Sequence, residues 1–123
     1  MTSLLSFAVW ALLAQNAMAS LVLAEADAGS TRDVKRGETV ELRLRENPST
    51  GYRWSIGIEP GDAAKIVASN SLPGTGGVGA AGSRAFEIVA NRPGAVTVNA
   101  KLMRQWEGEG SVVERRSFAL QVH

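Results

Sequence analysis

Apolar and polar residues alternate with a period of two along most of this chain after its first 24 residues. Within residues 39–45, for example, Val40, Leu42 and Leu44 fall on one side and the charged residues on the other. This pattern is typical of a strand with one buried face. The same reasoning predicts seven strands, two of them short, over residues 21–24, 39–45, 52–58, 66–68, 86–90, 96–102 and 118–122.

Turn-forming pairs separate these runs, among them Arg36-Gly37, Pro60-Gly61 and Pro93-Gly94. No segment has a convincing helical period, although residues 61–65 could form one helical turn. About seven short strands in roughly 100 residues favour an all-β fold, an antiparallel β-sandwich of two sheets. A small barrel is the alternative.

Charge and composition limit the partners and the kinds of reaction that we expect for this chain. Its 13 Lys and Arg residues nearly balance 12 Asp and Glu residues, so we expect no nucleic-acid or anionic-membrane partner. The absence of cysteine excludes a disulfide, a zinc–thiolate site and a thiol nucleophile. The only histidine, His123, ends the chain, where chains usually fray, and we expect it to be passive. We therefore expect neither an enzyme nor a bound cofactor.

Residues 1–24 carry no charged side chain. An apolar stretch over residues 4–13 is followed by Gln15-Asn16 and then by Ala17-Met18-Ala19, the layout of a secretory signal peptide cleaved after Ala19. The stretch is too short for a permanent membrane span; a buried or membrane-anchoring helix is the alternative. We predict a signal peptide over residues 1–19, a single domain over 20–123, and an exported protein that is periplasmic or secreted.

A stiff loop is predicted over residues 46–51, between two strong strands. Pro48 fixes its own φ, and Gly51 allows a backbone angle that other residues avoid. The hydroxyls of Ser49 and Thr50 can form local hydrogen bonds. The result is a projecting loop with small polar side chains at its tip, although an ordinary hairpin loop would have the same features.

Two further loops contain residues that the formation of a turn does not require. Residues 73–83 are rich in glycine, and 74–79 spell G-x-G-x-x-G; because a strand and not a helix follows, dinucleotide binding is not expected. Such a loop could lie against a partner or be simply disordered. Residues 103–110 contain Trp106, which we expect to be partly exposed. Tryptophan is common in binding hot spots; alternatively, Trp106 folds back onto the sandwich.

Taken in order, these loops resemble the chagasin family of cysteine protease inhibitors. The family's motifs are N-P-T-T-G-[YF], a glycine-rich G-x-x-G, and R-P-[WF]. This chain has Asn47-Pro48-Ser49-Thr50-Gly51-Tyr52, then Gly79-Ala80-Ala81-Gly82, then Arg104-Gln105-Trp106. Ser49 replaces a threonine and keeps a hydroxyl. Gln105 replaces a proline, which should leave the third loop less pre-organised.

The resemblance implies an immunoglobulin-like antiparallel β-sandwich that is a reversible, tight-binding inhibitor of papain-like cysteine proteases, whether cathepsin L-like or endogenous. It implies that all three motifs contact the protease, with Thr50 nearest the nucleophile, residues 79–82 along one side of the cleft and Trp106 across the other. Arg104 would support its loop or pair with an acidic rim. No cofactor and no membrane contact after signal cleavage are expected, and the protein should be a monomer. An exported immunoglobulin-like module that binds a surface protein or a polysaccharide is the alternative, followed by a structural domain.

Overall fold

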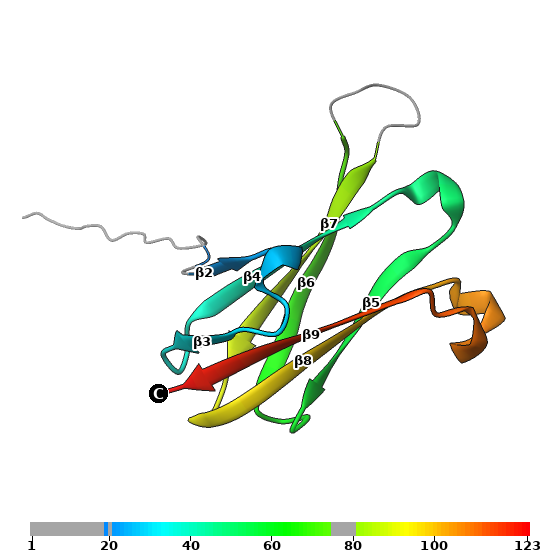
Figure 1. Ribbon diagram of the computed structural model, residues 1–123. Helices are drawn as coiled ribbons and strands as arrows, with labels where there is room; N and C mark the ends of the chain where they lie inside the picture. The colour runs from blue at the N-terminus through cyan, green and yellow to red at the C-terminus, as the bar shows by residue number, and fades with distance from the viewer. Residues whose placement is uncertain (1–18, 20, 75–80) are drawn as a thin grey trace, which may run out of the picture.

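Two four-stranded sheets face each other in this protein (Figure 1), according to a computed structural model that describes residues 19, 21–74 and 81–123. The first sheet has the strand order β2 (Leu21–Leu23), β4 (Thr39–Glu46), β7 (Gly82–Ala90), β6 (Ala64–Leu72). The second has the order β3 (Thr31–Val34), β9 (Glu114–Val122), β8 (Gly94–Met103), β5 (Arg53–Glu59). Short 3₁₀ turns lie at η3 (Glu25–Asp27), η4 (Pro48–Thr50), η5 (Gln105–Glu107) and η6 (Glu109–Ser111). The predicted two-sheet sandwich is confirmed.

The core lies between the sheets and is made by the inward rows that the alternation predicts. In β4 the inward residues Val40, Leu42 and Leu44 are each at most 1% exposed. Across the sandwich, β8 and β9 contribute apolar side chains of the same burial: Val96, Val98, Ala100, Phe118 and Leu120. Removing these surfaces from water is the main force that holds the two sheets together.

The strand pattern departs from the prediction at the N-terminal edge. The strand β3 was not predicted, because Thr31-Arg32-Asp33-Val34 offers only one apolar residue to the core. Both β2 and β3 are edge strands that pair in parallel, β2 with β4 and β3 with β9, while the remaining pairs are antiparallel. Alternation reveals which face of a strand is buried, but not which strand lies beside it or in which direction.

The predicted short strand over 66–68 is the middle of the longer β6. Its register shifts between Ile66 and Ala68, and this irregularity breaks the alternation that would have revealed the rest. The possible helical turn over 61–65 does not form. Instead, the amide of Ala63 donates to the carbonyl of Pro60 at 3.0 Å, and β6 starts at the next residue.

The C-terminus is held in the sheet, so the expectation that it frays was wrong. The amide of His123 donates to the Val34 carbonyl at 2.9 Å, and its own carbonyl accepts from the Arg36 amide at 3.1 Å. Its ring Nε2 lies 2.8 Å from Oδ1 of Asp33. The last residue therefore closes the end of β3 against β9, with an exposed side chain.

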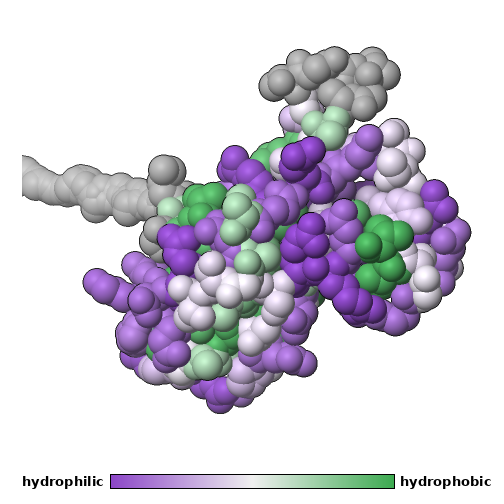
Figure 2. All heavy atoms as spheres, in the orientation of Figure 1, coloured by the Kyte–Doolittle hydropathy of each residue, from purple (hydrophilic) through white to green (hydrophobic). Residues whose placement is uncertain are grey.

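On the face that Figure 2 shows, hydrophilic side chains cover most of the described surface and hydrophobic ones gather only in small areas. The exposed large apolar residues of the described chain are Ile66 and Val67, which are neighbours in β6, and three that lie apart along the chain: Val22, Trp106 and Val113. Within the described residues no helix has the length and apolar character that crossing a membrane requires. Apart from Ala19, the predicted signal peptide lies outside the described residues.

Candidate functional site

The strand directions bring all three predicted loops to one end of the sandwich. The strands β4 and β6 both run antiparallel to β7, so they end at the same end, where Glu46 pairs with Gly82 and Leu72 with Ser83. In the other sheet Arg53 pairs with Met103, so β8 ends where β5 begins. The ends of β4, β6 and β8 therefore lie at the same end of the sandwich (Figure 1).

The predicted loop boundaries need small corrections. Glu46 is the last residue of β4, and Met103 is the last residue of β8. Gly82 and Ser83 belong to β7, because they still pair with β4 and β6. Tyr52, predicted to begin a strand, precedes β5. The first loop is therefore residues 47–52, and the third loop is residues 104–113.

The first loop is stiffened by its own side chains. Asn47 caps the 3₁₀ turn η4: its Oδ1 accepts from the amide of Ser49 at 3.1 Å and from the Ser49 hydroxyl at 2.7 Å. The Thr50 hydroxyl donates to the Asn47 carbonyl at 2.9 Å and accepts from the Tyr52 amide at 3.2 Å. Pro48 occupies the first turn of η4, where its fixed φ fits. Pro48, Ser49 and Thr50 are nevertheless exposed at the tip.

Two contacts join the third loop to the first. The Arg104 guanidinium donates from Nη2 to the Thr50 carbonyl at 3.3 Å, and its Cζ lies 4.5 Å from the centre of the Tyr52 ring. The Trp106 ring lies against Gly51: a Cβ built on Gly51 would be 2.8 Å from Cη2 of Trp106. Gly51 has φ of 80°, so a glycine is favoured there for both conformation and space.

Trp106 contacts the first loop while 71% of its surface remains exposed. It therefore does not fold into the core, and it presents a broad aromatic face next to the tip of the first loop. Tryptophan is enriched in binding hot spots, and a ring that a neighbouring loop already holds has less conformational freedom to lose on binding.

The third loop, in which Gln105 stands where the resemblance implies a proline, is supported by its own hydrogen bonds. The Ser111 hydroxyl accepts from the Arg104 amide at 3.1 Å and lies within 2.9 Å of the Arg104 carbonyl and 2.7 Å of the Gly108 carbonyl. The hydroxyl thus ties both ends of η5 together. The loop that contains Gln105 is closed by this serine, which partly offsets the conformational freedom that the missing proline leaves.

Glu109 fastens the third loop to the outside of the second sheet. Lys101 and Arg115 stand opposite each other on β8 and β9, an arrangement of like charges that would be unfavourable alone. Glu109 Oε1 lies 2.8 Å from Lys101 Nζ, and its Oε2 lies 3.3 Å from Arg115 Nη2. Hydrogen bonds from Lys101 and then from Arg115 lower the pKa of Glu109 below its ordinary value.

The strands beside the second loop approach each other too closely for a side chain. A Cβ on Gly82 would lie 2.2 Å from the Leu72 carbonyl oxygen and 3.1 Å from the Gly74 amide nitrogen. Glycine is therefore required at the end of the predicted G-x-x-G motif for a packing reason. Ala81 is exposed. Gly79 and Ala80, the first half of the motif, lie outside the described residues.

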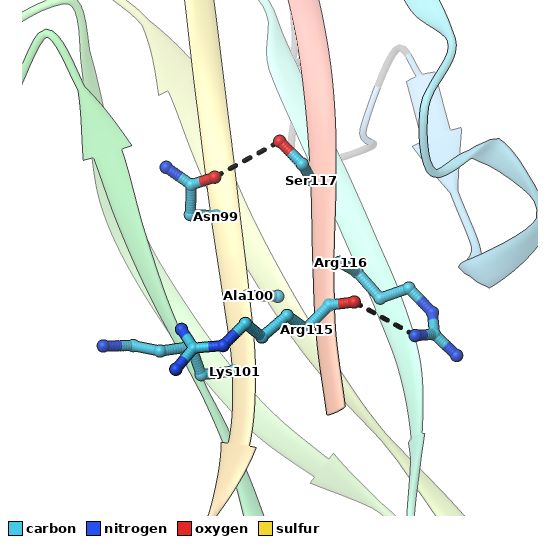
Figure 3. Close-up of a pocket in the computed structure, with 6 residues that line it drawn as sticks. All are labelled: Asn99, Ala100, Lys101, Arg115, Arg116 and Ser117. Carbon is cyan, nitrogen blue, oxygen red and sulfur yellow. Dashed lines mark hydrogen bonds between the residues drawn. The ribbon is translucent and has the colours of Figure 1, made fainter. Parts of the chain in front are cut away.

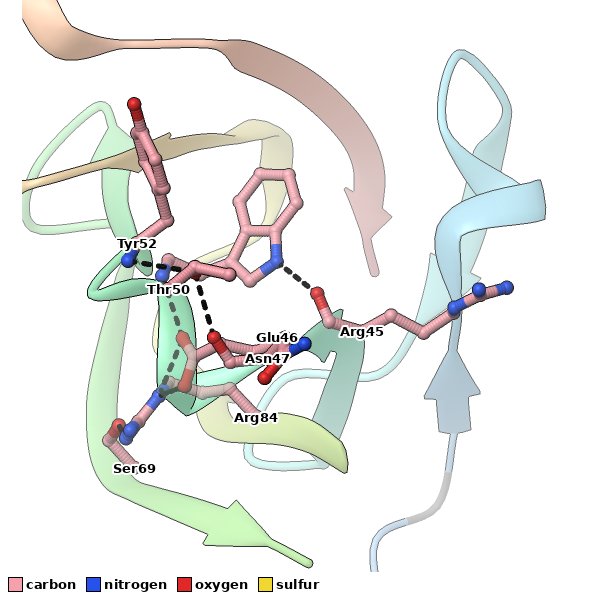
Figure 4. A network of polar contacts seen from close by, with 8 residues as sticks. Arg45, Glu46, Asn47, Thr50, Tyr52, Ser69 and Arg84 are labelled. Atoms are coloured by element: carbon pink, nitrogen blue, oxygen red, sulfur yellow. Dashed lines mark hydrogen bonds and ion pairs between the residues drawn. The ribbon is translucent and has the colours of Figure 1, made fainter. Parts of the chain in front are cut away.

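A buried acidic residue at the base of the first loop was not predicted to matter. The Glu46 side chain is 1% exposed. Its carboxylate accepts from the Trp54 amide at 2.8 Å and from Arg84 Nε at 3.1 and 3.2 Å. Figure 4 shows Arg84 reaching between Glu46 and Ser69, whose hydroxyl is 3.0 Å from Nη1. The alternation of the sequence could have revealed that Glu46 is buried, because Glu46 continues the inward row of Val40, Leu42 and Leu44.

Outside these loops, an open hollow of about 360 Å³ lies along β8 and β9 (Figure 3). It is lined by Asn99, Ala100, Lys101, Arg115, Arg116 and Ser117. Its polar groups are paired: Ser117 with Asn99 at 3.2 Å, and Lys101 and Arg115 with Glu109. Among the described residues, no group of three or more His, Asp or Glu side chains is placed to hold a metal ion. The loop end is therefore the candidate site.

Comparison with known proteins identifies similar chains. The family model described as "Chagasin family peptidase inhibitor I42" matches residues 33–122. The chain is 30% identical over 100 residues to chagasin from Trypanosoma cruzi, an alignment that covers 77% of this chain and 91% of that protein. Residues 33–122, which the family model matches, contain every described residue of the three loops.

Solved structures share the fold. The crystal structure of the cysteine protease inhibitor EhICP2 from Entamoeba histolytica matches with a TM-score of 0.74 at 22% identity, over 85% of this chain and 98% of that chain. The structure of PbICP-C in complex with falcipain-2 matches with a TM-score of 0.54 at 15% identity, over 90% of this chain and 96% of that chain. At these identities the two structures support the architecture of the sandwich.

Proposed function

Because the chain belongs to the chagasin family of I42 peptidase inhibitors, we propose that it is a reversible, tight-binding inhibitor of papain-like cysteine proteases. Its fold is shared with EhICP2, a cysteine protease inhibitor, and with PbICP-C, whose structure contains falcipain-2. The family is one of inhibitors and not of enzymes. The protein acts by filling the protease cleft with the loops at one end of the sandwich.

The observation that carries this proposal is the contact between the first and third loops. Arg104 is bonded to the Thr50 carbonyl, and Trp106 lies against Gly51. The two loops therefore form one continuous surface in the free protein. A surface that is formed before binding loses little conformational entropy when it enters a cleft, and this favours tight binding.

The same geometry favours resistance to hydrolysis. A thiolate must approach a carbonyl carbon to about 3–3.5 Å in the correct direction. In the first loop the Asn47 carbonyl accepts from Thr50, the Pro48 carbonyl from Gly51, and the Thr50 carbonyl from Arg104. These bonds hold the peptide planes of the loop in fixed orientations, so the loop can lie over the nucleophile without turning a carbonyl into the direction of attack.

Within this proposal the loop residues have distinct roles. Thr50, at the exposed tip, is the group nearest the protease nucleophile, and Ser49 lies beside it. Residues 79–82 lie along one side of the cleft with their backbone. Trp106 stacks on the opposite side, while Arg104 holds the loops together instead of pairing with the protease rim.

A titration of residues 20–123 against papain and a cathepsin L-like enzyme tests the function, with a serine protease as the control. Stoichiometric, reversible inhibition of the two cysteine proteases alone is expected. Thr50→Ala and Trp106→Ala should each weaken inhibition by about 1–3 kcal/mol, or roughly 5- to 150-fold in Ki. Unchanged inhibition constants for both variants would reject the loop assignment.

We also propose that the protein is exported, with residues 1–19 removed as a signal peptide. The charge-free apolar start and the Ala17-Met18-Ala19 sequence support this. Cleavage after Ala19 leaves every described strand intact, since β2 starts at Leu21. The mass of the protein recovered from periplasm or medium should fit a chain that starts at residue 20. Recovery of the uncut chain in the membrane fraction would contradict this.

A further inference from the structure

The carboxylate of Glu46 is the most deeply buried charged group among the described residues. Its side chain is 1% exposed, and its ion-pair partner Arg84 is 13% exposed. Burying a charged pair carries a large desolvation cost, and well-packed apolar side chains would usually stabilise the same site as well or better. Leu44, the preceding inward residue of β4, shows that the core accepts an apolar residue in this row. Stability alone therefore does not explain a glutamate at this position.

The bonds of Glu46 join the strands that carry the first and second loops. The Trp54 amide, 2.8 Å from Glu46, lies in β5 of the opposite sheet, two residues after the first loop. Arg84 lies in β7, two residues after Gly82. Through its Nη1, Arg84 also reaches Ser69 of β6, the strand that leads into the second loop. The Glu46 carboxylate, directly and through Arg84, thus connects the strands before and after the first loop with the strands before and after the second.

A second bond fixes the same corner. The indole Nε1 of Trp54 donates to the Arg45 carbonyl at 2.7 Å, immediately beside Glu46 (Figure 4). The first loop leaves one sheet at Glu46 and enters the other at Arg53, so its orientation depends on how these two strand ends are held. The described bonds that span this gap are those that Trp54 makes to Arg45 and Glu46.

We propose that Glu46 is a positioning residue, whose buried carboxylate fixes the orientation of the first loop and its placement beside the strands of the second. It would not touch the protease, and its effect would act through residues 47–52. The inference rests on the proposed inhibitory function for its effect on affinity, but its effect on the free loop can be measured without a protease.

The variant Glu46→Gln tests this in the full mature chain. The amide keeps the shape of the side chain and an acceptor for Trp54, and it removes the charge that holds Arg84. Amide hydrogen exchange would follow residues 49–52, whose N–H groups are bonded within the loop. We expect exchange there to speed up by about tenfold or more, and Ki for papain to rise by about tenfold or more through faster dissociation. Arg84→Gln should produce the same changes, and the double variant should add little.

Two controls separate positioning from stability. Val122→Ala creates a cavity in the core at the opposite end of β9, where the side chain is 2% exposed. Asp62→Asn breaks a solvent-exposed pair with Arg92, 2.7 Å apart, in the loops at that same end. All proteins are compared well below their melting temperatures. Both controls should keep the loop exchange and Ki of the wild type, although Val122→Ala should melt earlier.

If Glu46→Gln lowers the melting temperature but leaves loop exchange and Ki like those of Val122→Ala, the residue is only structural and the inference is overturned. If the wild type itself fails to inhibit papain and the cathepsin L-like enzyme, the proposed function fails. The hydrogen-exchange comparison still decides the positioning role in that case, because it needs only the free protein.

Discussion

Replacing Gly51 with alanine would separate the stability of the fold from the arrangement of its binding loops. Gly51 has φ of 80°, and an added Cβ would lie 2.8 Å from Cη2 of Trp106. The substitution therefore has two consequences. It strains the backbone of the first loop, and it pushes away the aromatic ring of the third loop.

The two effects differ in size and in the measurement that detects them. A non-glycine residue in the left-handed region costs about 1–2 kcal/mol of folding free energy. Displacing Trp106 costs little further stability, because the clash involves the far end of a side chain that is 71% exposed. Inhibition should lose part of the contribution of this anchor, about 1–3 kcal/mol or roughly 5- to 150-fold in Ki.

Gly37→Ala is the matched control. Gly37 has φ of 90°, but an added Cβ there would meet nothing within 4 Å. It lies before β4, at the end of the sandwich away from the loops. Both variants should lose about 1–2 kcal/mol in urea unfolding, and only Gly51→Ala should raise Ki for papain.

Two results would refute this reasoning. Equal inhibition constants for the two glycine variants would show that the contact between Gly51 and Trp106 has no part in binding. The second concerns the background Trp106→Ala, in which the ring is already absent. If Gly51→Ala weakened inhibition there as much as in the wild type, the two residues would act independently.

Two further predictions concern the third loop. Gln105→Pro should raise stability by about 0.4–1 kcal/mol in thermal unfolding, with Ki unchanged or lower. A proline fits there because Gln105 is the first residue of η5 and Arg104 before it is extended, with φ −92° and ψ 110°. A marked rise in Ki would show that binding uses the glutamine itself. Glu109→Gln should lower the melting temperature at pH 7. The pKa of Glu109 is lowered in the folded protein by Lys101 and Arg115, so its contribution is present above the unfolded pKa and disappears as pH falls through the folded pKa. The two melting temperatures should therefore converge in acid, and a constant difference down to pH of about 2 would contradict this linkage.

The sequence predicted the loops of the candidate site more completely than the residues at their base that hold them in place. Pro48 and Gly51 predict a stiff loop because each of these residue types has a local backbone preference. The structure adds which bonds produce the stiffness. Glu46 was assigned to the same loop and received no role, because a glutamate beside a turn normally faces water.

The contacts between loops were beyond local reasoning. Arg104 lies 54 positions after Thr50 in the chain, and no spacing rule connects them. Their contact depends on β8 ending beside the start of β5, which is a property of strand order. For the same reason, the tether from Ser111 to Arg104 could not be found from the motif, although it lies in the same loop.

Side-chain alternation and turn chemistry are local properties, and they were enough to favour a two-sheet sandwich and to predict the inward rows of its main strands and the loops that contain the motifs. The parallel edge strands, the contact of Trp106 with Gly51 and the burial of Glu46 between Trp54 and Arg84 became visible only in the folded protein. These depend on which strands become neighbours, and the packing of the two sheets as a whole selects those neighbours.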